Sequence, residues 1–175
     1  GSRRDLGSHP AGSRPDRWSS WPDRLMSDQF LVVIPSDPLA ELPPTAEVMR
    51  QALAGMARTG EARIKDYGKL QFIDAGQNAK NIRCSACDAL VEPDQWHVWM
   101  QNDWHGEDGF HLHRHRLPCC GVELTLNDLR YDGPQGFSRW FVSARDNGRG
   151  ALTLAELQTL SALAGLPLKA IQQRY

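Results

Sequence analysis

The sequence lacks any long hydrophobic run. No stretch of its 175 residues approaches the roughly 18 apolar residues that a membrane-spanning helix requires. The arginine pair Arg3-Arg4 is not followed by the apolar segment that an export signal carries. The sequence therefore predicts neither a membrane span nor a secretory leader, and we expect a cytoplasmic location.

The chain also lacks a strong net charge. Its 20 Lys and Arg nearly balance its 21 Asp and Glu, which leaves a formal net charge of −1. Proteins that bind nucleic acid or anionic membranes through a general electrostatic attraction carry an excess of positive charge. The composition as a whole gives no reason to expect either partner.

Cysteine is scarce, and the four that occur form two pairs. The first pair is Cys84 and Cys87, spaced as Cys-x-x-Cys, and the second is the adjacent Cys119 and Cys120. In a reducing cytoplasm, clustered cysteines are more often metal ligands than disulfides. Because two thiol pairs presented by turns suit the tetrahedral coordination of zinc, the sequence predicts a zinc site formed by these four residues.

The second pair departs from the usual pattern. A standard zinc-binding turn reads Cys-Pro-x-Cys-Gly, whereas here Leu117 occupies the first cysteine position before Pro118. Cys119 must then supply the missing thiolate, which requires a tight turn because adjacent side chains diverge in a strand. If Cys119 points away, a histidine must be the fourth ligand, and His115 is the nearest substitute. His111, His113 and His115 alternate, so a strand at 110–117 would place all three on one face, exposed to solvent.

A structural role for the metal is favoured over a catalytic one. Residues 78–133 are poor in aliphatic side chains, and a structural zinc contributes roughly 10 kcal/mol or more at neutral pH, which would offset that deficit. Four protein thiolates also leave no position for an activated water. A zinc deaminase is disfavoured because the cysteines after Pro118 are adjacent rather than spaced by two. A redox role is disfavoured because Asp88 follows Cys87.

The rest of the chain predicts one α+β domain. Residues 1–25 read as a tail or expression remnant, with Met26 as the natural start, so the domain spans 26–175. The expected elements are a doubly buried strand at 30–34, a helix from Thr45 to 59, strands at 62–65 and 70–73 around a Tyr67-Gly68 turn, a strand at 137–144, a second helix and a closing strand at 168–175. This order predicts a ferredoxin-like two-layer βαβ/βαβ sandwich with a zinc-ribbon-like insert at about 78–133.

The last helix has the clearest local signals. Thr153 and Glu156 are spaced as a capping box, and Gly165 suits the left-handed residue that ends a helix. Its predicted buried stripe contains Leu154, Leu157, Leu160 and Ala164.

Two groups of residues in the insert are candidates for partner binding. Trp96, Trp99 and Trp104 would form either a satellite core or an exposed aromatic patch for a protein partner. Arg114 and Arg116 belong to a small basic cluster, which gives only weak support for nucleic acid because acidic residues lie nearby in the sequence.

The run Leu117–Gly121, followed by Leu126–Tyr131 and Gly136-Phe137, resembles a family of uncharacterised bacterial zinc-ribbon-containing proteins. That family has an upstream Cys-x-x-Cys and an "LPCCG…SLNDL.Y..P.GF" core, and the similarity covers about residues 70–175. Thr125 stands where the family has Ser, and Asp146-Asn147-Gly148 replaces an Asn-Pro. The resemblance implies that the Cys119-Cys120 pair binds metal, and it implies no activity.

These observations predict a non-enzymatic zinc-binding protein that acts through protein–protein interaction, with a toxin-neutralising immunity protein as one concrete form. The first alternative is a nucleic-acid-binding zinc-ribbon protein that uses the arginines and tryptophans of the insert. The second is a zinc-dependent enzyme, which would need an open coordination position.

Overall fold

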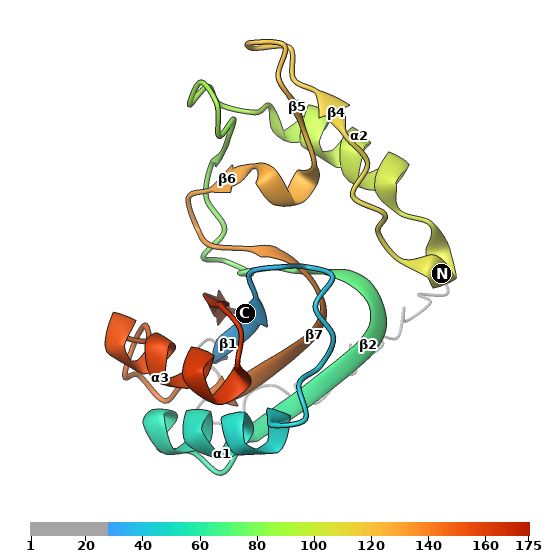
Figure 1. Cartoon of the computed structure of the whole chain (residues 1–175). Helices are drawn as coiled ribbons and strands as arrows, with labels where there is room; N and C mark the ends of the chain where they lie inside the picture. The colour runs from blue at the N-terminus through green and yellow to red at the C-terminus, as the bar shows by residue number, and fades with distance from the viewer. Residues whose placement is uncertain (1–27) are drawn as a thin grey trace, which may run out of the picture.

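The computed structural model describes residues 28–175, and Figure 1 shows how its elements are arranged. The predicted tail, residues 1–25, lies outside the described residues. Within the described part of the chain, no helix is long and apolar enough to cross a membrane. The elements divide into a main sheet with two helices and a smaller insert between the second and third strands of that sheet.

The main sheet has four strands: β1 (Gln29–Pro35), β2 (Ala62–Ile73), β7 (Gly136–Arg145) and β8 (Leu168–Arg174). They lie in the order β2-β7-β1-β8, and each is antiparallel to its neighbours. Two helices, α1 (Ala46–Ala57) and α3 (Leu154–Ala164), pack against each other and against one face of the sheet (Figure 1). The predicted mixture of helices with a sheet is confirmed.

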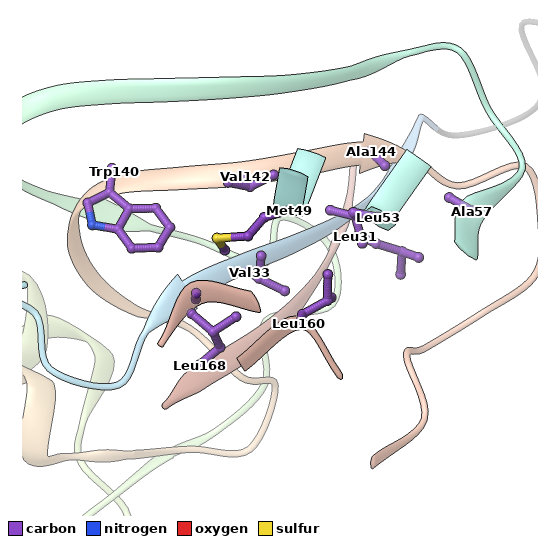
Figure 2. Close-up of a cluster of buried hydrophobic side chains, with 11 residues drawn as sticks. Leu31, Val33, Met49, Leu53, Ala57, Trp140, Val142, Ala144, Leu160 and Leu168 are labelled. Carbon is purple, nitrogen blue, oxygen red and sulfur yellow. The ribbon is translucent and has the colours of Figure 1, made fainter. Parts of the chain in front are cut away.

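β1 is buried on both faces, as its continuous apolar run predicts. Leu31 and Val33 point towards the helices, whereas Val32 and Ile34 belong to a second apolar cluster on the opposite face. Figure 2 shows the helix-side core. Its buried members come from the sheet and from both helices: Leu31, Val33, Met49, Leu53, Ala57, Trp140, Val142, Ala144, Leu160, Ala164 and Leu168.

β2 is one irregular strand, so the prediction of two strands around a Tyr67-Gly68 turn is wrong. Both halves pair with β7, and the register shifts between Asp66 and Gln71. Gly68 adopts a φ of 66°, and its N–H donates to the Asp66 carboxylate over 3.0 Å. A glycine with positive φ lets the extra residues bulge out without reversing the chain.

α3 begins and ends as predicted. The Thr153 hydroxyl accepts from the Glu156 N–H over 3.1 Å, and the Glu156 carboxylate accepts from the Thr153 N–H over 2.9 Å. Gly165 ends the helix in the left-handed conformation, with a φ of 72°. The prediction of a buried stripe is correct for Leu160 and Ala164 but wrong for Leu154, which is 71% exposed. At 3.6 residues per turn, Leu154 lies about 120° around the helix from Leu160.

The insert contains one helix, short strands and two 3₁₀ turns, and it occupies the upper part of Figure 1. The helix is α2 (Pro93–Asp103), and the 3₁₀ turns are Gly106–Asp108 and Leu126–Asp128. Two pairs of short strands accompany them: β3 (Ile82–Arg83) pairs with β6 (Arg130–Tyr131), and β4 (His115–Arg116) pairs with β5 (Glu123–Leu124). Its apolar core includes Leu70 of β2 and Phe137 of β7. The insert is therefore packed onto the ends of the two strands that carry it.

The sequence pattern does not predict α2, because its mixture of Trp, His, Gln and Asp has weak apolar periodicity. Two local signals mark its start: Pro93 stands at the beginning of the helix and Asp94 lies in the first turn. Trp99 and Asp103 are its buried residues, and a spacing of four places them on one side.

Replacing Thr153 with alanine should lower the free energy of unfolding by about 1 kcal/mol, because the Glu156 N–H loses its acceptor. Urea denaturation followed by circular dichroism measures this loss. Thr159→Ala, in the middle of the same helix, is the matched control. It removes only a hydroxyl bond to the Ala155 carbonyl, and the change should stay below about 0.5 kcal/mol. Equal losses in the two variants would contradict the capping role of Thr153.

Candidate metal centre

The first cysteine pair lies in a tight turn directly after β3. The Cys84 N–H donates to the Ala89 carbonyl over 2.8 Å, and the Asp88 N–H donates back to the Cys84 carbonyl over 2.9 Å. Asp88 closes the turn with a φ of 67°. The turn places the thiols of Cys84 and Cys87 on the same side, with Cys84 buried and Cys87 exposed.

The second turn, between β4 and β5, repeats the same backbone pattern. The Leu117 N–H donates to the Val122 carbonyl over 2.9 Å, and the Gly121 N–H donates to the Leu117 carbonyl over 2.9 Å. Gly121, with a φ of 75°, takes the place that Asp88 has in the first turn. Leu117 thus occupies the first-cysteine position, as the sequence predicts. Its side chain is 1% exposed and belongs to the insert core.

Cys119 supplies the thiol that Leu117 lacks. The sulfur atoms of Cys84, Cys87, Cys119 and Cys120 all lie within 4.8 Å of one another. The Cys84 and Cys120 sulfurs are 3.8 Å apart, and those of Cys119 and Cys120 are 3.9 Å apart. Tetrahedral zinc with Zn–S bonds of about 2.3 Å places its sulfur ligands about 3.8 Å apart. The cluster could therefore hold a metal ion with little rearrangement.

The four thiols differ in their electrostatic environments. Burial raises the pKa of Cys84, but the N–H groups of Cys87 and Ala86 and the neighbouring thiols outweigh it and lower the pKa to about 7. Burial and the other three thiols raise the pKa of Cys119 to about 12. The Val122 N–H and the Cys119 thiol lower the pKa of Cys120, but burial and the Cys84 and Cys87 thiols together outweigh them and raise it. A bound cation would stabilise the thiolates of Cys119 and Cys120, which these surroundings disfavour.

His115, the predicted substitute ligand, does not join the thiol cluster. Its ring packs on Trp99 with the ring centroids 5.5 Å apart, and its Nε2 lies 4.0 Å from the Asp103 carboxylate. Burial lowers the pKa of His115, although Asp103 opposes the shift. The structure therefore brings together the four-cysteine set rather than three cysteines and a histidine.

The candidate partner-binding residues fall into different environments. Trp99 is only 8% exposed and lies in the insert core, and Trp96 is half-buried, with its indole N–H donating to the Tyr131 hydroxyl over 3.2 Å. Trp104 is 41% exposed. Arg114 and Arg116 are exposed beside the second cysteine turn. Of the three tryptophans, Trp104 offers the largest surface to a partner.

The expectation that His111, His113 and His115 share one face of a strand is wrong. Leu112 adopts a φ of 56°, which interrupts the alternation, and only His115 belongs to a strand. His111 and His113 instead approach His105, so that three imidazoles form a second cluster. A lone leucine with positive φ has no sequence signature, and this arrangement could not be predicted from spacing.

Asp103 fixes the backbone of this loop from the inside of the insert. Its carboxylate is fully buried and accepts from the N–H groups of Leu112, over 2.8 Å, and His113, over 2.6 Å. These bonds hold the loop in the conformation that the positive φ of Leu112 requires. The Asp103 carboxylate at the end of α2 therefore holds the part of the loop that carries Leu112 and His113.

Asp103→Ala should lower the free energy of unfolding by about 2 kcal/mol or more, because two N–H groups lose a charged acceptor. Asp108→Ala removes an exposed carboxylate from the same region and should change stability by less than about 0.5 kcal/mol. Thermal and urea unfolding of both variants measure the difference. Indistinguishable variants would mean that the Asp103 bonds contribute nothing to stability.

Comparison with known protein families, with curated proteins and with solved structures finds no match to this chain. The family resemblance of Leu117–Gly121 and Leu126–Tyr131 stays a prediction. What the geometry supports directly is narrower: four cysteines from two equivalent turns form a candidate metal centre.

Proposed function

We propose that this chain is a zinc-binding protein that acts by binding another protein, and that the four-thiol centre is structural rather than catalytic. The proposal has two parts, the identity of the metal and the location of the binding surface. Each part rests on different residues and has its own test.

Zinc is the metal that best fits the ligand set. Four thiolates at near-tetrahedral separations are typical of structural zinc sites, and they leave no position for a reactive water. A metal would add to the apolar core of the insert, whose strands are only two residues long, by joining its two cysteine turns. A bound zinc would contribute on the order of 10 kcal/mol to the order of this region.

We also infer a ferredoxin-like main domain and a zinc-ribbon-like insert. The strand order β2-β7-β1-β8, with α1 following β1 and α3 following β7, supports the first assignment. Two equivalent turns, each carrying cysteines at the end of a short strand, support the second. The insert occupies the connection between β2 and β7, which are neighbours in the sheet.

The binding surface we propose is a hollow between the first cysteine turn and α2. It has a volume of about 300 Å³, and apolar side chains dominate its walls: Ile82, Leu90, Val91, Pro93 and Trp96. Leu90 is 56% exposed at its edge, and Lys80, Glu92 and His97 add polar groups around it. An apolar hollow with a polar rim suits an apolar anchor side chain of a protein partner. This hollow is the observation that carries the proposal.

The wall and base of the hollow are both held in place. Leu90 follows the first cysteine turn and forms a bridge with Arg83, so its position depends on the geometry of Cys84 and Cys87. At the base, Trp96 donates to the Tyr131 hydroxyl, which donates to the Leu126 carbonyl over 2.8 Å. A surface prepared in this way loses little conformational freedom on binding. Neutralisation of a toxin by an immunity-type protein is one form that such tight binding would take.

Metal analysis of the full chain should find at least one zinc, the one bound by the four thiols. Cys119→Ser should lower the zinc content and abolish the ordered near-UV circular dichroism of the insert, because the ligand that replaces the missing first cysteine is lost. Ser85→Ala, in the first turn, is the control and should retain zinc. Full zinc retention by Cys119→Ser would show that Cys119 is not a ligand.

Affinity capture from the native host with the full chain as bait should recover a protein partner in a stable stoichiometric complex. Leu90→Asp should weaken this complex at least tenfold, because it places a charge in the apolar hollow. Val48→Asp changes an equally apolar exposed residue in the first turn of α1, far from the hollow in sequence, and should leave binding unchanged. No stable partner, or equal effects of both substitutions, would overturn the proposed surface.

A further inference from the structure

Three exposed histidines outside the thiol centre converge on one point. His105 follows α2, and His111 and His113 lie on the loop before β4. One ring nitrogen of each lies within 4.8 Å of the others, and the Nε2 atoms of His105 and His113 are 2.8 Å apart. The rings of His105 and His111 are stacked with their centroids 3.7 Å apart.

The backbone that carries these rings is firmly held. The His105 N–H donates to the Gly109 carbonyl over 2.9 Å, and the Phe110 N–H donates to the Leu70 carbonyl of β2 over 3.0 Å. Gly109 has a φ of 71°, and a Cβ there would lie 2.4 Å from the Leu70 carbonyl oxygen, so only glycine fits. Together with the buried Asp103 carboxylate, these contacts fix the backbone positions of the three histidines.

Ion pairs with neighbouring carboxylates do not explain why the three imidazoles lie together. Among residues 28–175, no ion pair joins His105, His111 or His113 to a carboxylate. Three exposed imidazoles repel one another once more than one is protonated, and a single hydrogen bond between two of them is a small compensation in water. A shared cation that binds neutral imidazoles would use all three nitrogens at once.

We propose that His105, His111 and His113 form a second metal site, for a divalent first-row transition ion such as zinc, cobalt or nickel. Tetrahedral coordination with metal–nitrogen bonds of about 2.0–2.1 Å places ligand nitrogens about 3.3 Å apart. The separations in the structure, 2.8 Å for one pair of nitrogens and at most 4.8 Å within the set, bracket this value. Imidazole ligands suit these metals, whereas the four thiols form a softer and chemically distinct site.

The second site differs from the thiol centre in leaving one coordination position open. His111 and His113 line an open hollow of about 650 Å³ whose other polar walls are Lys69, Glu107, Asp108 and Arg139. Three protein ligands with a free fourth position allow the ion to bind water or an exchangeable donor from solution. The cationic Lys69 and Arg139 are balanced by the acidic Glu107 and Asp108, so the walls impose no charge on that donor. The site therefore goes beyond the protein-binding role and does not depend on it.

Cobalt titration of the metal-free full chain, followed by absorption spectroscopy, tests the site. We expect a first equivalent with sulfur-to-cobalt charge-transfer bands and a second equivalent with ligand-field bands only. The triple variant His105→Ala/His111→Ala/His113→Ala should lose the second equivalent and keep the first. His97→Ala, an exposed histidine on α2, is the control and should bind both.

Further outcomes of this titration separate the parts of the proposal. Azide should alter the ligand-field bands of the second cobalt if its fourth position is open, and unchanged bands would overturn that part of the proposal. Saturation of the wild-type chain after the first equivalent, or a second equivalent that survives in the triple variant, would overturn the site itself. Loss of the charge-transfer bands from the wild-type chain, with the second equivalent intact, would instead remove the thiol centre alone.

Discussion

The convergence of four sulfur atoms at one end of the insert is the contact on which the insert depends. The turns at Cys84–Cys87 and Leu117–Cys120 come from distant parts of the chain; each is closed by its own backbone bonds, and its first residue is buried in the insert core. The strands beside these turns are two residues long, too short to fix the relative position of the turns by themselves. A metal ion that joined the sulfurs would fix the geometry of the cysteine turn beside the Leu90 hollow.

The insert and the main sheet are coupled through two strands that take part in both cores. β2 contributes Ile64 to the helix-side core and Leu70 to the insert core. β7 contributes Trp140 and Val142 to the first and Phe137 to the second. Because each strand is a continuous paired element, the two cores cannot separate without breaking the β2–β7 ladder. The sheet thus positions both candidate metal sites.

Much of the main domain and the thiol centre could be predicted from sequence, because local patterns encode them. The apolar run of β1, the capping box of α3 and the cysteine turn with Leu117 in the ligand position are all visible within a few residues. The histidine cluster is not, because it depends on a positive φ at Leu112 and a buried carboxylate at Asp103. Tertiary contacts impose the Leu112 conformation and the burial of Asp103, and no periodicity in the sequence predicts either.

The place where the insert joins the sheet has a consequence for how this protein can vary. Ile73 and Gly136 are paired across β2 and β7, so the insert begins and ends one strand spacing apart, about 4.8 Å. Pairing of β2 with β7 brings the two ends of the insert together, so the entropy cost of closing this segment is part of the cost of forming the sheet. Because that cost rises only slowly with chain length, residues added to an exposed loop of the insert would change the stability of the four-stranded sheet little.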